Sequence, residues 1–200
     1  ASRCLRVDFR PIPTEVLVAA AAEEGFDPDA VAVAARAAGG DLERVRALLS
    51  DEAASQRWRR WSDLLGRVDG TAATASGLVA ELIADLDAAG EALAASHARQ
   101  LESFDHAEGD TPRGQTGRRK RLEERHKREA RRLRNDALRA GMAALADEAR
   151  ARAVDAAGAQ AYGRVGDGLA DLELALLHNA REDLALLALL LALGEPTPSL

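Results

Sequence analysis

The stretch that decides the fold runs from residue 118 to residue 154 and reads RRKRLEERHKREARRLRNDALRAGMAALADEARARAV. Its less polar side chains recur at intervals that fit one face of an α-helix. These positions are Leu122, His126, Leu133, Ala137, Met142 and Leu145. The stretch therefore predicts one very long helix, which begins near Arg118 and runs toward Val154.

Further helices are predicted on both sides of this stretch. Two apolar series with helical spacing precede it: Trp58, Trp61, Leu64, Leu65 and Val68, then Leu78, Leu82, Ile83, Leu86, Leu93, Leu101 and Phe104. Residues 107–117 are rich in Gly, Pro, Asp and Thr and predict a loop. Glycines between Gly158 and Gly168 weaken the prediction of a helix there. Residues 184–193 are apolar all round and predict a final buried helix.

The first fifty residues predict a short strand followed by three short helices. Leu5, Val7 and Phe9 alternate with polar residues, which is typical of a half-buried strand over residues 4–10. A single strand is not stable alone, so we expect its sheet upstream and interpret the chain as the C-terminal part of a larger protein. The predicted N-caps of the helices within 14–52 are Thr14, Asp27 and Asp41.

Composition favours an all-α protein of the cytoplasm. Of the 200 residues, 47% are hydrophobic but only 3% are aromatic, and the apolar side chains are mostly Ala and Leu, which favour helices. Cys4 is the only cysteine, so an internal disulfide is excluded and a reducing compartment is expected. The ten apolar residues of 184–193 are too few for a membrane span, so no membrane partner is expected.

No motif in the sequence indicates catalysis or a cofactor bound by this chain. There is no Gly-Lys pair, so the phosphate-binding loop of nucleoside triphosphatases is missing from these residues. The glycines of 163–168 follow no predicted strand, as a dinucleotide turn would require. The four histidines are scattered and fit neither a metal site nor a hydrolase. We expect no enzymatic activity from this chain alone.

Positive charge is concentrated in one segment. Residues 117–139 contain eleven Lys or Arg and four Asp or Glu, a net charge of +7, whereas the whole chain carries −6. On a helix, six arginines can form a cationic stripe that contacts nucleic acid, or else an acidic protein partner. They are Arg118, Arg121, Arg125, Arg128, Arg132 and Arg139. A solvated helix face, with pairs such as Glu124 to Arg128, is the simpler alternative.

Three parts of the sequence together resemble the delta-prime subunit of bacterial DNA polymerase III, a clamp-loader subunit of the AAA+ superfamily. The first is Ser2-Arg3-Cys4, followed by a strand and, at residues 39–49, a helix similar to that of clamp-loader lid domains. The second is LEERHKREARR, residues 122–132, with NDAL at 135–138, which looks like the long helix of the collar domain. The third is LHNAREDLALL at 177–187, similar to the closing collar helix.

The resemblance implies an all-α architecture with three parts. Residues 1–13 would end a missing RecA-like core, 14–52 would be a three-helix lid domain, and 53–200 would be the helical collar that joins subunits. Arg3 would be a trans-acting arginine finger that reaches ATP-Mg held by a neighbouring subunit. Where hydrolysing relatives have an arginine in the third lid helix, this chain has Glu43, with Arg44 beside it, which argues against hydrolysis by this subunit.

The implied function is that of a non-hydrolysing subunit in the hetero-oligomeric clamp loader. Its partners would be the gamma/tau and delta subunits and, indirectly, the sliding clamp and primer-template DNA. The complex belongs to the DNA polymerase III holoenzyme. Two alternatives stay open: a helical interaction protein with a basic arm that binds nucleic acid, and a fragment of the gamma/tau ATPase itself.

Overall fold

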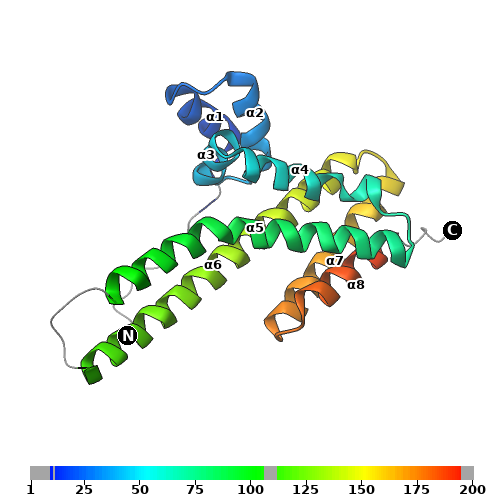
Figure 1. Ribbon diagram of the computed structural model, residues 1–200. Helices are drawn as coiled ribbons and strands as arrows, with labels where there is room; N and C mark the ends of the chain where they lie inside the picture. Colours follow the sequence, from blue (N-terminus) through cyan, green and yellow to red (C-terminus); the bar gives the residue numbers. More distant parts are fainter. Residues whose placement is uncertain (1–9, 11, 106–111, 195–200) are drawn as a thin grey trace, which may run out of the picture. The chain divides into compact units, whose positions relative to one another are not determined.

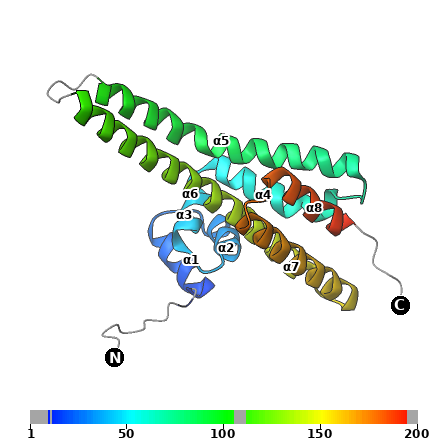
Figure 2. The same cartoon turned by 90° about the horizontal axis from the view of Figure 1, so that it is seen from below.

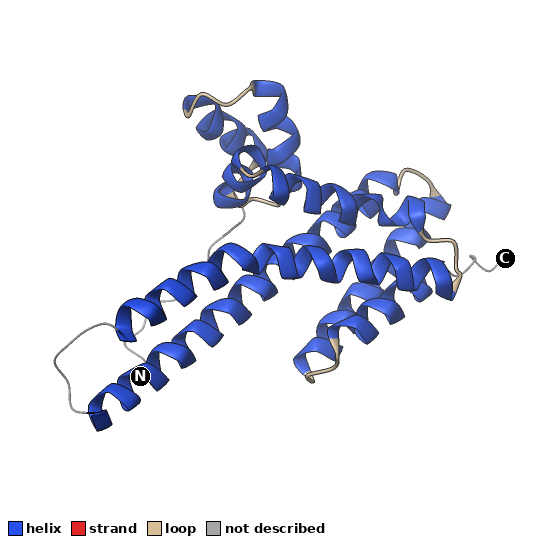
Figure 3. Cartoon of the chain, viewed as in Figure 1, coloured by secondary structure: helices blue, strands red, loops and turns tan. Residues whose placement is uncertain are grey.

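The structure is a computed structural model that describes residues 10, 12–105 and 112–194. Within these residues every regular element is an α-helix, which confirms the predicted all-α class (Figure 3). Ser2, Arg3 and Cys4, together with nearly all of the strand predicted over residues 4–10, lie outside the described residues. The contacts divide the chain into two units, Ala1–Arg59 and Arg60–Leu200, and each is described by itself.

The first unit contains three short helices, α1 (Thr14–Glu23), α2 (Pro28–Ala37) and α3 (Leu42–Ser50). All three pack against one another around a small apolar core. Its buried members are Leu17, Ala21, Val31, Ala34, Ala35, Ala38 and Val45. Because most of these side chains are alanine or valine, the helices can approach closely. Larger, partly buried side chains pack against this core: Val18, Phe26, Leu42, Leu48 and Leu49.

Two of the three predicted caps in this unit are confirmed. The Asp27 side chain accepts a hydrogen bond from Ala30 N at 3.0 Å, and the Asp41 side chain accepts one from Arg44 N at 3.2 Å. The prediction for Thr14 is wrong, because Thr14 is the first residue of α1 and Pro13 holds the cap position without a side-chain hydrogen bond. Proline suits that boundary since it lacks a backbone donor.

The second unit is built around a long antiparallel hairpin of two helices, α5 (Ala72–Asp105) and α6 (Pro112–Arg152). These helices run side by side, and their connected end extends well beyond α7 (Ala156–Leu177) and α8 (Glu182–Gly194) (Figures 1 and 2). At about 1.5 Å per residue, the 41 residues of α6 span about 60 Å. Helix α4 (Glu52–Arg67) begins in the first unit and ends in the second.

Three predictions about the second unit need correction. Helix α6 begins at Pro112 rather than near Arg118, so part of the predicted loop 107–117 is helical. Proline is compatible with the first turn of a helix, where its missing donor is not needed. Helix α7 continues through Gly158, Gly163, Gly166 and Gly168, because packing outweighs the low helix propensity of glycine. Helix α8 is buried on one face only, since Leu184 is 55% exposed.

The core of the second unit lies where α4, α7 and α8 cover one part of the α5–α6 hairpin. Trp61 and Leu64 of α4 are buried there, as are residues of the other four helices. Those residues include Leu78, Leu82, Leu86, Leu138, Leu145, Val165, Leu172, Leu186, Leu189 and Leu190. Beyond Leu86 on α5 and before Leu138 on α6, the buried side chains among the described residues are two histidines, His97 and His126.

Candidate interaction surface on helices α6 and α7

The six arginines of the predicted stripe are all exposed on α6. Three of them have carboxylate neighbours on the same helix: Arg125 lies 3.6 Å from Glu129, and both Arg132 and Arg139 lie 3.9 Å from Asp136. These distances are near the upper limit of an ion pair, and exposed pairs of this kind contribute little to stability. The carboxylate of Glu124, expected to pair with Arg128, lies 3.2 Å from Lys127 Nζ instead.

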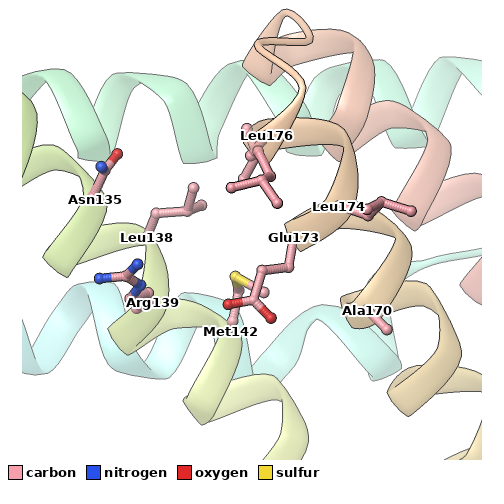
Figure 4. Close-up of a pocket in the computed structure, with 9 residues that line it drawn as sticks. Asn135, Leu138, Arg139, Met142, Ala170, Glu173, Leu174 and Leu176 are labelled. Atoms are coloured by element: carbon pink, nitrogen blue, oxygen red, sulfur yellow. The ribbon is translucent and has the colours of Figure 1, made fainter.

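A groove lies between α6 and α7 and has a volume of about 520 Å³. Asn135, Leu138, Arg139 and Met142 line it from α6, and Ala170, Glu173, Leu174, Leu176 and Leu177 line it from α7. The two helices diverge here, so their side chains face one another across open space (Figure 4). Leu174 and Leu177 are 53% and 77% exposed, which is unusual for leucines that belong to a helix–helix boundary.

A second, shallower hollow adjoins the groove on the surface of α6. Its lining consists of Arg128, Arg131, Arg132, Asn135, Asp136 and Arg139, so it shares Asn135 and Arg139 with the groove. Four arginines and one aspartate give it a net positive charge. The cationic stripe predicted from the sequence is therefore continuous with an apolar groove, and the two form one surface.

Arg134 connects α6 to two neighbouring helices. Its Nε donates to Glu182 Oε2 of α8 at 2.7 Å, and its Nη1 donates to Asp87 Oδ1 of α5 at 2.6 Å. Partial burial opposes the positive charge, but the hydrogen bonds that Arg134 donates to both carboxylates raise its pKa above the usual value. Arg134 thus joins three helices next to the groove and holds its α6 wall in place.

The buried histidines lie between α5 and α6 in the extended part of the hairpin. Their rings are stacked, with centroids 3.9 Å apart and 5° between the ring planes. His97 Nε2 lies 2.9 Å from Glu129 Oε2, and His126 Nε2 lies 2.9 Å from Gln100 Oε1. Burial, and next the positive charges of His97 and Arg125, lower the pKa of His126 below its ordinary value. The surroundings of His126 therefore favour its neutral ring.

The sequence also assigned roles to Arg3, as an arginine finger, and to Glu43 with its neighbour Arg44. Arg3 lies outside the described residues. Glu43 forms an ion pair with Arg46 on the surface of α3. Its neighbour Arg44 donates to the backbone oxygen of Ala38 at 3.4 Å. Both side chains thus have local structural roles within the first unit.

Among the described residues there is no group of three or more His, Cys, Asp or Glu side chains arranged to hold a metal ion. The described helices also include none that is both long and apolar enough to cross a membrane. Comparisons with protein-family models, with curated proteins and with solved structures found no match to this chain.

The α6 side of the surface was predictable from the sequence, but the α7 side was not. The arginine spacing in the sequence was sufficient to place a stripe on one helix face. Leu174 and Leu177 carried no comparable signal, because apolar residues at helical spacing predict a buried face. Their exposure results from the divergence of α7 from α6, which sequence spacing does not encode.

Proposed function

We propose that this chain is a non-hydrolysing assembly subunit of a clamp loader of the delta-prime type. In this role the first unit is the lid domain and the second is the collar that holds neighbouring subunits. The chain contributes helical contact surface rather than chemistry of its own. The proposal rests on the three resembling stretches of sequence, two of which fall on α6 and on the α7–α8 region.

The observation that best supports an assembly role is the accessible surface on α6 and α7. A groove with two exposed leucines is continuous with a row of exposed arginines on a helix of 41 residues. Exposed leucines that line a groove beside a row of charged side chains are typical of surfaces that bind another protein. The small separate helical unit at residues 14–50 further agrees with a lid followed by a collar.

Arg3 has a distinct role in the proposal. A guanidinium is always charged and offers several donors in a plane, so it can stabilise the charge that develops on a γ-phosphate held by a neighbouring subunit. Arginine fingers of this kind raise phosphoryl-transfer rates about 10³- to 10⁵-fold in comparable systems. The chain would act only on nucleotide bound elsewhere in the complex.

Reconstitution tests this proposal. The purified chain, mixed with gamma/tau and delta subunits at micromolar concentration, is expected to co-elute with them in size-exclusion chromatography. Within the assembled complex, Arg3→Ala is expected to lower the DNA-stimulated ATPase activity while leaving assembly unchanged. Failure of the chain to join these subunits would refute the collar role, and unchanged ATPase activity would refute the role of Arg3.

Direct contact with nucleic acid is the second candidate function, and the exposed arginines of α6 favour it. A protein that neutralises several phosphates binds more weakly as salt increases. If α6 binds duplex DNA, replacing Arg121 and Arg128 with glutamate is expected to weaken binding and to reduce its salt dependence. Binding that is absent at low salt would exclude this candidate.

A further inference from the structure

We propose that the groove between α6 and α7 binds an amphipathic helix of a partner protein. The partner helix has leucine-like side chains along the face that enters the groove and acidic side chains along the flank that meets α6. This inference names the surface and the chemistry of its occupant. It rests on the groove itself and does not depend on the clamp-loader proposal.

The spacing of the lining residues is the first argument. On α6 they occupy 135, 138, 139 and 142, and on α7 they include 170, 173, 174 and 177. Each set follows the i, i+3, i+4, i+7 pattern by which a helix packs against a neighbouring helix. Both helices thus present a packing face to the same space, and neither fills it. A third helix placed along the groove would contact both faces at once.

The exposed leucines are the second argument. Leu138 is almost fully buried at the base of the groove, but Leu174 and Leu177 leave 53% and 77% of their surface exposed. Removing apolar surface from water is the main favourable term in the association of helices with grooves. An occupant with apolar side chains at helical spacing would cover both leucines and the thioether of Met142.

Charge determines which kind of helix fits. Arg139 lies on the α6 wall, and Arg128, Arg131 and Arg132 extend the positive charge along the same helix. Asp136 lies 3.9 Å from both Arg132 and Arg139, too far for short hydrogen bonds. Carboxylates of a partner can approach these guanidinium groups more closely and in the bidentate geometry that arginine favours. The α7 wall carries Glu173 instead, so the acidic flank of the partner faces α6.

The same features favour a protein over nucleic acid as the occupant. Neither hollow has an aromatic side chain on which a base could stack. The Glu173 carboxylate would repel a phosphate, and the exposed leucines would gain nothing from one. A protein helix accounts for the arginines and the leucines together.

Peptide binding tests the proposal directly. The probe is a fluorescein-labelled helical peptide of about 15 residues, with leucines at i, i+4 and i+7 and glutamates along one flank. Fluorescence anisotropy with the whole chain is expected to give a Kd on the order of 10 µM. Two control peptides, with lysines in place of the glutamates or serines in place of the leucines, are each expected to bind at least about tenfold more weakly.

Variants of the chain locate the binding. Leu177→Ser and Arg139→Glu are each expected to weaken binding of the acidic peptide about tenfold, because each removes one of the two complementary features. Matched controls are Leu184→Ser, a similarly exposed leucine outside the groove, and Arg99→Glu, an exposed arginine on α5. Both controls are expected to bind as the unchanged chain does. All four sites are on the surface, and circular dichroism verifies that the helices persist.

Four results would overturn the proposal. The first is that the acidic peptide does not bind at all. The second is that the Leu177→Ser variant binds this peptide as tightly as the Leu184→Ser variant does. The third is that a labelled DNA duplex binds and Arg139→Glu weakens its binding, while the same substitution does not change peptide binding. The surface would then be a nucleic-acid site. The fourth is that the chain self-associates in sedimentation, that Leu177→Ser abolishes this self-association, and that the peptide does not bind. The occupant of the groove would then be a second copy of the chain. If the chain does not join the gamma/tau and delta subunits, the clamp-loader proposal fails. The groove proposal is decided separately by the peptide-binding assay.

Discussion

Trp61 of α4 occupies the space that a side chain at Gly141 of α6 would need. A Cβ atom built on Gly141 would collide with the Trp61 ring, and that ring is almost completely buried, with 2% of its surface exposed. Gly141→Ala is therefore expected to lower the free energy of unfolding by about 1–3 kcal/mol, even though alanine favours helix over glycine by about 1 kcal/mol. Urea unfolding followed by circular dichroism measures the change.

Two comparisons test the cause of that loss. In a Trp61→Phe background the smaller ring leaves room, so Gly141→Ala is expected to cost less there than in the unchanged chain. At Gly163 of α7, the place that a Cβ atom would take has no other part of the described chain within 4 Å, its chain neighbours and the backbone of its own helical turn aside. Gly163→Ala is therefore expected to stabilise the chain by about 0.5–1 kcal/mol. Equal costs in both backgrounds would contradict a clash with Trp61.

Arg134 is expected to matter more for stability than the arginines of the stripe. Arg134→Met removes hydrogen bonds to Asp87 and Glu182 and is expected to cost about 1 kcal/mol, because the side chain is only 29% exposed. Arg132→Met, in which the replaced side chain is 87% exposed, is expected to change stability by less than about 0.5 kcal/mol. Thermal unfolding of both variants compares them. Equal shifts in Tm would mean that Arg134 does not join the helices energetically.

The histidine pair predicts loss of stability in mild acid. Burial lowers the pKa of His126, and within the described chain its buried Nδ1 meets no hydrogen-bond partner. The unfolded chain therefore binds a proton near pH 6.5 more readily than the folded chain does. Stability is expected to be highest above that pH and to fall as pH decreases through 6.5 toward the lower pKa of folded His126, below which this contribution levels off.

The relevant comparison is between pH 7.5 and 5.5, above the range in which Glu24, Glu81 and Asp69, whose pKa values are lowered by hydrogen bonds, take up protons. His126→Gln removes the titrating ring. The urea concentration at the midpoint of unfolding is therefore expected to change less between pH 7.5 and 5.5 than in the unchanged chain. His178→Gln, at an exposed position, is expected to leave the pH dependence unchanged. If the stability of His126→Gln depended on pH as strongly as that of the unchanged chain, His126 would be excluded as the source of the pH dependence.

Loss of an aspartate cap in the first unit is expected to destabilise only the helix that it caps. Asp27→Ala removes the hydrogen bond to Ala30 N and is expected to destabilise the start of α2 by about 1 kcal/mol. Amide exchange in α2, measured by mass spectrometry, is expected to become about fivefold faster, while exchange in α7 stays the same. Thr14→Ala is the matched control, because Thr14 lies within α1 rather than at its N-cap. A similar response to both changes would contradict the cap.

The sequence by itself determined the local features of this protein. Alanine and leucine abundance with few aromatics predicted an all-α chain, and the spacing from Leu122 to Leu145 predicted the long helix. Asp27 and Asp41 predicted two helix starts correctly, because a cap depends on groups within three residues. The arginine stripe was predictable for the same reason, since one helix fixes which of its own residues share a face.

Only the tertiary structure decided the features that depend on helices distant in sequence. The glycines of α7 predicted a weak helix, but packing against α6 and α8 stabilises it regardless. Leu174 and Leu177 have a pattern that predicts burial, yet they are exposed because α7 diverges from α6. The stacking of His97 on His126 and the packing of Trp61 against Gly141 likewise join residues dozens of positions apart. Local sequence determines each helix and its faces, whereas packing between helices determines which faces are covered and which remain open to a partner.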